Sequence, residues 1–257
     1  MNSILIASNS FKECISSVDV SRLIKSSILR YLPSNYQFDI QLTPLSDGGD
    51  GFLETCKHYF NLLEVKFFVT SLVGNNKIEV SVGIDVNAKI CYVESADIVG
   101  VKLLSGKKDP YNFSTFGIGE LFEKIDDYNK VNNYLFNTVI LGIGGTATND
   151  LAIGVCKYFN IKTLIDSENI NVKPYDFCKI EKIEWVKPKF SFNIKIVTDV
   201  NNSLFGNEGA TYCFGLQKGI KEQDLHHFEE GFINIINLLN VNYNNEQLLS
   251  GAGGGLA

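Results

Sequence analysis

The first sixty residues alternate between short apolar runs and amphipathic segments, and this order constrains the fold more than any other feature. Residues 3–8 form an apolar run, and Ser16 or Ser17 can cap a helix that follows it. Residues 37–43 alternate like a strand, and residues 52–60 predict a second helix. A strand–helix–strand–helix order implies a parallel sheet with right-handed crossovers. We therefore expect an α/β protein with a buried first strand.

Near Thr70 the pattern changes to closely spaced strands. Residues 65–70, 77–85 and 89–94 are strand-like, and only short turns separate them. This spacing favours a mixed or antiparallel sheet, and a second domain is expected to begin near Ser71. Further elements are expected as helices at 115–125, 150–159 and 221–240, buried strands at 138–142 and 193–198, and a mixed, partly exposed region at 161–189.

Four segments are candidate ligand loops: residues 46–51, 142–150 and 214–219 combine glycine with acidic, amide or basic side chains, and residues 199–202 read Asp-Val-Asn-Asn directly after a predicted strand. Ligand sites of open α/β sheets lie at the carboxyl ends of strands, where most of these loops are predicted. Glycine permits close backbone approach, and backbone N–H groups at a helix start can hold an anion. Each loop can equally be a plain turn or helix cap, with Asp50, Thr148 or Asn149 as the capping residue.

The charged residues of these loops suggest phosphate chemistry. Asp47 and Asp50 suit a hard cation such as Mg²⁺, and Asp199 is placed to act as a general base or as a Mg²⁺ ligand. Lys12, just past the first strand, and Lys218, between two glycines, could each bring a positive charge to a phosphate. Taken alone, each is more simply explained as an exposed lysine in a turn.

Residues 142–147 also fit the loose dinucleotide pattern G-x-G-x-x-A, and Asp166 follows at roughly the 20-residue spacing that the pattern requires. An NAD-dependent oxidoreductase is therefore an alternative function. The sequence contains no phosphate-loop motif, no serine-hydrolase elbow and no protein-kinase motif set.

Composition and charge limit the partners, the cellular location and the metal sites that the chain can have. The net charge of −6 and the lack of a basic run argue against nucleic acid as a partner. No apolar stretch reaches the length of a membrane span, and the N-terminus lacks the pattern of a signal peptide. The six cysteines form no C-x-x-C pair, and none of the three histidines has ligand-like spacing to them. We therefore expect a cytoplasmic protein with free thiols and no zinc site.

Taken in order, seven segments resemble the motifs of the type I glycerate kinase family: residues 7–13, 45–51, 114–121, 142–150, 199–206, 214–219 and 251–257. The resemblance implies ATP-dependent phosphorylation of D-glycerate with Mg²⁺, in a cleft between two α/β domains. The outer domain would be a parallel, doubly wound domain built from residues 1–70 and continued by residues 251–257. The inserted domain, residues 71–250, would be mixed α/β.

The resemblance also implies roles for single residues. Asp47, Asp199 and Lys12 would be catalytic, and the two aspartates would divide the roles of general base and Mg²⁺ ligand. ATP would contact Gly142, Gly144, Gly145, Thr146 and Lys218, and D-glycerate would contact Ser10, Asn149, Asp150 and Asn201. The resemblance leaves open whether the product is 2- or 3-phosphoglycerate and whether the chain forms a homo-oligomer.

The chain departs from the family pattern at three loop positions and at its end. Leu151 stands where the family usually has glycine after Thr-Asn-Asp, and Leu216 and Ser203 each replace a usual proline. Family members also continue well beyond the 251–257 loop, so an inactive, truncated remnant is a third alternative.

Overall fold

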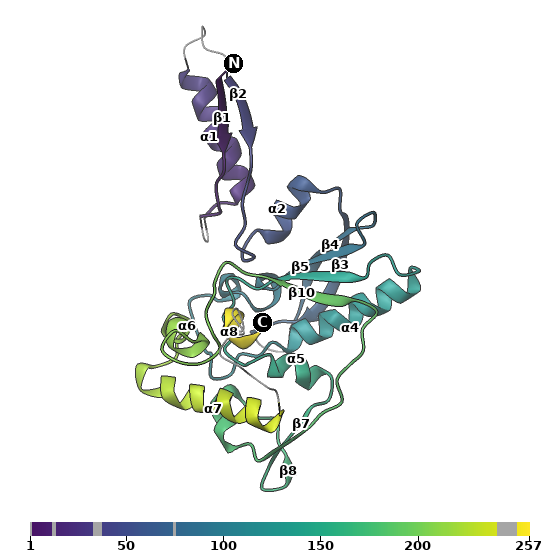
Figure 1. The fold of residues 1–257 in the computed structure, drawn as a ribbon, viewed down its shortest axis with the longest axis vertical. Helices are drawn as coiled ribbons and strands as arrows, with labels where there is room; N and C mark the ends of the chain where they lie inside the picture. Colours follow the sequence, from purple (N-terminus) through teal and green to yellow (C-terminus); the bar gives the residue numbers. More distant parts are fainter. Residues whose placement is uncertain (1, 12–13, 33–37, 74–75, 241–250) are drawn as a thin grey trace.

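The computed structural model describes residues 2–11, 14–32, 38–73, 76–240 and 251–257. The chain is an α/β protein, as predicted, and its described strands form a two-stranded, a five-stranded and a three-stranded sheet. Figure 1 shows the two-stranded sheet and its helix extending from one end of the larger body, with α2 at the junction. Lys12 lies outside the described residues.

The two-stranded sheet contains β1 (Asn2–Ile6) and β2 (Phe38–Leu42), which pair in parallel. Helix α1 (Ser17–Tyr31) connects them, and the Ser16 side chain caps it by accepting from the N–H of Asp19 at 3.2 Å. The prediction of a buried first strand is wrong, because a two-stranded sheet with one helix has little to cover it. Ile6 is buried, but Leu5 is 63% exposed. Much of the predicted apolar face of α1 is also exposed, including Leu23, Ile24 and Tyr31.

The five-stranded sheet has the order β10-β6-β5-β4-β3. Its strands are β3 (Leu63–Thr70), β4 (Lys77–Asp85), β5 (Ile90–Glu94), β6 (Thr138–Gly142) and β10 (Asn193–Val197). Strands β5, β6 and β10 are parallel, whereas β3 and β4 join them as an antiparallel hairpin pair. The mixed sheet expected from the close strand spacing is thereby confirmed. β3 pairs along its whole length with β4, so it belongs to this sheet.

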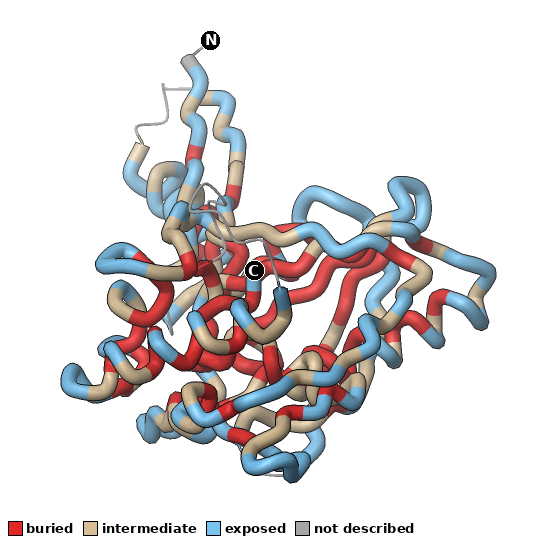
Figure 2. Tube along the Cα trace, turned by 60° about the horizontal axis from the view of Figure 1, so that its bottom comes forward, coloured by how far each residue is buried: buried red, intermediate tan, exposed pale blue. Residues whose placement is uncertain are grey.

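Helices cover both faces of the five-stranded sheet. One face packs against α4 (Phe116–Val131), and Val93 and Leu141 point into that core. The other face packs against α2 (Phe52–Tyr59), where Tyr92 contacts the apolar side of the helix. Figure 2 shows the buried residues concentrated along these strands and the helix faces that meet them.

Strand β10 lies at the edge of the sheet and pairs only with β6 among the described strands. The prediction of a buried strand at residues 193–198 is therefore wrong, since Ile194 is 39% exposed. The apolar run predicted a strand correctly, but its burial depends on a second neighbour that the topology does not supply.

The remaining elements surround the loops. They are α3 (Ala96–Val99), η1 (Val101–Leu103), α5 (Ile153–Tyr158), β7 (Lys162–Ile165), β8 (Glu168–Asn169), η2 (Pro174–Lys179), β9 (Lys182–Glu184), α6 (Ala210–Lys218), η3 (Glu222–Asp224), α7 (Leu225–Leu238) and α8 (Ala252–Gly255). The helix predicted from residue 150 begins only at Ile153, because Leu151 and Ala152 are left-handed. Across the described residues, no helix combines the length and apolarity that crossing a membrane requires.

Candidate functional site

Three of the predicted loops meet where β6 and β10 end. The N–H of Gly144 donates to the carbonyl oxygen of Gly48 at 3.1 Å, and the N–H of Ile143 donates to that of Val197 at 3.1 Å. Residues 46–51 therefore lie against residues 142–145 and beside the start of the 199–202 loop. Carboxyl ends of parallel strands are the usual place for a ligand site in an α/β sheet.

Most glycines of these loops serve loop-to-loop packing. A Cβ atom on Gly144 would lie 2.7 Å from the backbone nitrogen of Gly49, and one on Gly48 would lie 2.5 Å from the carbonyl oxygen of Val197. Gly145 differs, because it is exposed and a Cβ atom added to it would lie no closer than 3.6 Å to any neighbour, the nearest being Oδ1 of Asp50. Of the predicted phosphate-contacting glycines, Gly145 has the most room for a ligand, whereas Gly142 and Gly144 are enclosed by other loops.

The segment 251–255 completes the cluster. The N–H of Leu151 donates to the carbonyl oxygen of Gly254 at 3.2 Å, and the N–H of Gly251 donates to that of Asn202 at 3.1 Å. Ala252 and Leu256 pack into the core of the five-stranded sheet. We refer to residues 46–51, 142–150, 197–202 and 251–255 as the glycine-loop site.

Lys218 lies beneath this site, at the end of α6. Its Nζ donates to the carbonyl oxygen of Thr148 at 2.6 Å and to Oγ1 of Thr146 at 3.3 Å. The residue is only 5% exposed, and burial lowers its pKa to about 7. Lys218 is therefore not the exposed turn lysine that the sequence suggested as one alternative; it holds the 146–148 segment from below.

Asn149 and Asp150 are also buried. Oδ2 of Asp150 accepts from the backbone N–H groups of Thr115 at 2.8 Å and Gly154 at 3.2 Å, so it holds the starts of α4 and α5 together. Burial raises the pKa of Asp150. Asn149 donates to the side chain of Thr211. Neither Thr148 nor Asn149 caps α5, whose N-cap position is Ala152.

The two candidate catalytic aspartates lie on adjoining loops. Oδ1 of Asp47 accepts from the N–H of Gly49 at 2.8 Å, which closes a tight turn. Asp199 is exposed and makes no hydrogen bond or ion pair to another described residue, and Asn201 is exposed beside it. The free oxygens of two carboxylates at one sheet edge have the donor chemistry that Mg²⁺ prefers.

Glu94 is a residue of this region that the sequence analysis missed. It is 4% exposed, and its two carboxylate oxygens accept from the N–H groups of Gly51 and Leu53, each at 3.1 Å. It therefore caps α2 in the place predicted for Asp50. Lys102 donates to Glu94 at 2.7 Å. Burial and the nearby Asp97 raise the pKa of Glu94. Its position at the end of a predicted strand was the available signal.

The N-terminal loop reaches the same region. Oγ of Ser10 lies 3.4 Å from the carbonyl oxygen of Asp50, to which it donates. Ser10, Asp50, Glu94 and Lys102 line a hollow of about 510 Å³. Lys102 lies 3.6 Å from Asp50 as well, so the charges in this hollow are largely paired.

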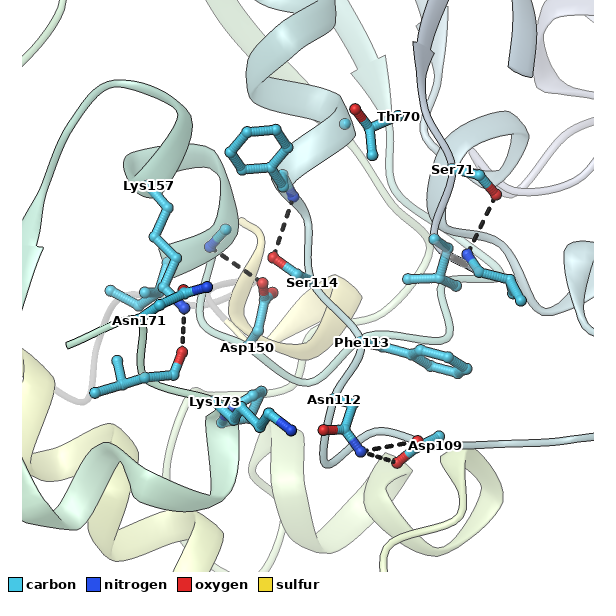
Figure 3. Close-up of a pocket in the computed structure, with 18 of the residues that line it drawn as sticks. Thr70, Ser71, Asp109, Asn112, Phe113, Ser114, Asp150, Lys157, Asn171 and Lys173 are labelled. Atoms are coloured by element: carbon cyan, nitrogen blue, oxygen red, sulfur yellow. Dashed lines mark hydrogen bonds between the residues drawn. The ribbon is translucent and has the colours of Figure 1, made fainter. Parts of the chain in front are cut away.

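A larger cavity, of about 1020 Å³, lies on the other side of Asp150 (Figure 3). It is bounded by the start of α4 and by the segment from α5 to η2. Four lysines line it: Lys107, Lys157, Lys162 and Lys173. The Lys157 ammonium group donates to the carbonyl oxygen of Val172, and burial lowers its pKa. Asp150 is the one predicted site residue that lines this cavity.

The dinucleotide pattern does not have the surroundings that it needs. In a nicotinamide-binding fold the pattern opens directly into a helix. Here the left-handed Leu151 and Ala152 separate residues 142–147 from α5. Asp166 lies in the exposed turn between β7 and β8, which belong to another sheet. The alternative of an NAD-dependent oxidoreductase therefore loses its structural basis.

Comparison with known proteins identifies similarity to one family. The model of the glycerate kinase family matches residues 4–257. The glycerate kinase of Halalkalibacterium halodurans is 29% identical over 100% of this chain and 67% of its own length. That of Haemophilus influenzae is 31% identical over 88% of this chain and 60% of its own length.

A solved structure agrees with these sequence matches. The crystal structure of a Salmonella typhimurium LT2 protein named glycerate kinase 2 has a TM-score of 0.74 and 25% identity, and covers 99% of this chain and 68% of its own. The chain thus spans about three fifths to two thirds of the length of these relatives.

Proposed function

Because this chain belongs to the glycerate kinase family, we propose that it performs the ATP-dependent phosphorylation of D-glycerate to phosphoglycerate. One observation carries the proposal beyond the family match. Loops from four distant parts of the chain meet at the carboxyl edge of parallel strands, and they bring Asp47, Asp199 and Gly145 to one side of the sheet.

Phosphoryl transfer depends mainly on positioning and charge neutralisation. We propose that Gly145, with its open surroundings, is where the backbone approaches a phosphate of ATP. One of the two carboxylates, Asp47 or Asp199, would accept the proton of the glycerate hydroxyl group. Lys218 would act from below by fixing the backbone of Thr146–Thr148, so we assign it a positioning role.

Whichever of Asp47 and Asp199 does not act as the base would hold Mg²⁺, the second cofactor we propose. Asp47 uses one oxygen for the turn to Gly49, and the carboxylate of Asp199 is exposed. Mg²⁺ bound there would offset the negative charge of the phosphates. Ser10 and Asn201 flank these loops and are proposed contacts of D-glycerate, together with Lys12, which lies outside the described residues.

We assign the reaction to the glycine-loop site rather than to the larger cavity. The cavity lining lacks Asp47 and Asp199, and its most buried lysine, Lys157, already donates to a carbonyl oxygen. The predicted substrate contacts Asn149 and Asp150 are buried beneath the loops, so we propose that they support the site without touching D-glycerate.

We also propose the two-part organisation that the family resemblance implied, with a modified boundary. A division at Ser71 would separate β3 from β4, with which it pairs fully. A boundary between α2 and β3 avoids this break. Ala252 and Leu256 pack into the core of the large sheet, which favours grouping this last segment with the inserted part.

The six unpaired cysteines are consistent with a cytoplasmic location.

An assay of ADP release that requires both ATP and D-glycerate tests the function. The Halalkalibacterium halodurans glycerate kinase serves as the positive control. We expect D-glycerate-dependent ADP release that disappears on omission of Mg²⁺, and NMR of the product identifies the phosphorylated hydroxyl. A folded chain that releases no ADP while the control enzyme is active would contradict the proposal.

A further inference from the structure

Three side chains with metal-binding atoms meet at a place that shares no residue with the glycine-loop site. They are Cys178 on η2 and His227 and Glu230 on α7, and their ligand atoms all lie within 4.8 Å of one another. His227 and Glu230 are three positions apart on a helix, so they share one face. Cys178 is 49 positions from His227, which is why sequence spacing gave no sign of a metal site.

Hydrogen bonding fixes the histidine in the form that a metal needs. Nε2 of His227 lies 2.7 Å from the carbonyl oxygen of Tyr175, which can only accept, so Nε2 carries a proton. In the neutral ring the lone pair is then on Nδ1, which faces Sγ of Cys178 at 3.8 Å. Metal-bound histidines commonly donate their second N–H to a backbone carbonyl in this way.

The surrounding contacts hold the cluster together without using its ligand atoms. Nδ2 of Asn234 donates to the carbonyl oxygens of Phe177 and Ile180 at 2.9 and 2.8 Å, which fastens η2 to α7. Gly231 permits the close approach, because a Cβ atom there would lie 2.9 Å from Cβ of Phe177. The position of Cys178 opposite α7 is therefore built into the packing.

The separation between Sγ of Cys178 and Nδ1 of His227 suits a tetrahedral ion. With bond lengths of about 2.3 Å to sulfur and 2.0–2.1 Å to nitrogen, two ligands of tetrahedral Zn²⁺ lie about 3.6 Å apart. The Cys178–His227 separation of 3.8 Å is close to this value. We propose that Cys178, His227 and Glu230 bind Zn²⁺ or a similar divalent transition-metal ion, with water as the fourth ligand. Thiolate, imidazole and carboxylate together favour Zn²⁺ over Mg²⁺ or Ca²⁺.

The present partners of these groups are weak and replaceable. Sγ of Cys178 donates to the carbonyl oxygen of His227 at 3.1 Å. This bond ends when the thiol releases its proton to water and binds the metal ion as a thiolate. Glu230 is paired with His226 at 3.2 Å, and both are well exposed, so this ion pair contributes little stability. A bound ion would connect η2 to α7 and stabilise the folded chain by mass action.

Titration of the untagged, chelator-treated chain with Co²⁺ tests the site. We expect one equivalent to produce visible tetrahedral d–d bands and a near-ultraviolet band from sulfur to cobalt, both displaced by Zn²⁺. The C178S variant should lose the ultraviolet band, and E230Q, a change at an exposed position, should bind Co²⁺ at least tenfold more weakly. The H226A and C213S variants, at the neighbouring histidine and at an exposed thiol, should titrate like the wild type.

A thermal measurement provides a second readout that is independent of enzyme activity. Zn²⁺ at a few equivalents should raise the melting temperature of the wild-type chain and leave that of E230Q and C178S nearly unchanged. The proposal is wrong if Co²⁺ gives no tetrahedral spectrum with the wild-type chain. It is equally wrong if C178S and E230Q, folded by circular dichroism, give the wild-type spectrum and affinity.

Discussion

The buried ammonium group of Lys218 donates to the carbonyl oxygen of Thr148, 70 positions earlier in the chain, at 2.6 Å. This contact connects the end of α6 to the loop that follows β6. It also puts a titratable group where water cannot stabilise its charge, and burial lowers its pKa from 10.5 to about 7. Lys218 should therefore make a contribution of its own to the pH dependence of the free energy of unfolding.

The sign of that dependence follows from the two pKa values. The unfolded lysine keeps its proton up to pH 10.5, whereas the folded one loses it near pH 7. Between these values unfolding takes up a proton, so the free energy of unfolding rises with pH. Below about pH 7 the cost of burying the charge is present in full.

We predict that urea denaturation at pH 7, 8 and 9 will give a steeper rise in unfolding free energy for the wild type than for K218M. The methionine keeps the apolar stem but has no titratable group, so the difference between the two slopes isolates Lys218. Parallel slopes for the two proteins would mean that Lys218 titrates as an ordinary lysine.

A second prediction separates packing glycines from glycines that have room for a ligand. G144A places a Cβ atom 2.7 Å from the backbone of Gly49, and overpacking of this kind costs about 1–3 kcal/mol. We expect both the free energy of unfolding and the kinase activity to fall. G145N should instead keep its stability, because Gly145 has space and asparagine tolerates its φ of 68°, but it should lose ATP affinity. Equal destabilisation by both changes would contradict this distinction.

A third prediction concerns the cap of α2. In E94Q one amide nitrogen must face a backbone N–H of Gly51 or Leu53, so at least one charge-assisted hydrogen bond is lost, at about 1.5–3 kcal/mol. D97N is the matched control, because Asp97 also pairs with Lys102 but is more exposed than Glu94. This change should lower the free energy of unfolding by only about 0–1 kcal/mol. Urea denaturation of both variants measures the difference. A larger loss in D97N would show that Glu94 is not the cap that matters.

A fourth prediction addresses the chemistry. D199N should lower turnover at least about a hundredfold, the range of a lost general base, while the melting temperature stays unchanged because Asp199 is exposed and supports no described contact. E208Q, at an exposed acidic residue of the following loop, is the control and should retain full activity. Wild-type turnover in D199N would remove Asp199 from the mechanism.

Sequence patterns predicted many helices and strands well, because capping and the spacing of apolar residues depend on residues that are close together in the chain. The cap at Ser16, the strand at residues 138–142 and the amphipathic helix before residue 240 were all confirmed. The loops were predicted at strand ends, and the structure brings three of them together there.

Burial was harder to predict, since it depends on neighbours that are distant in sequence. The run at residues 193–198 resembles a central strand, but β10 has one partner and is exposed. Lys218 resembles an exposed turn lysine, yet the fold covers it. The cluster of Cys178, His227 and Glu230 exists only because η2 packs on α7.

The contact between the N–H of Leu151 and the carbonyl oxygen of Gly254 joins segments about a hundred residues apart, and contacts of such long sequence separation form slowly in folding. The same holds for Gly144 with Gly48. We therefore expect the strands and helices to form before these loops meet, so that a refolding chain gains its ligand-binding surface after most of its secondary structure. Pulse-labelled hydrogen exchange during refolding checks this order, because the amides of Gly144 and Leu151 should then become protected last.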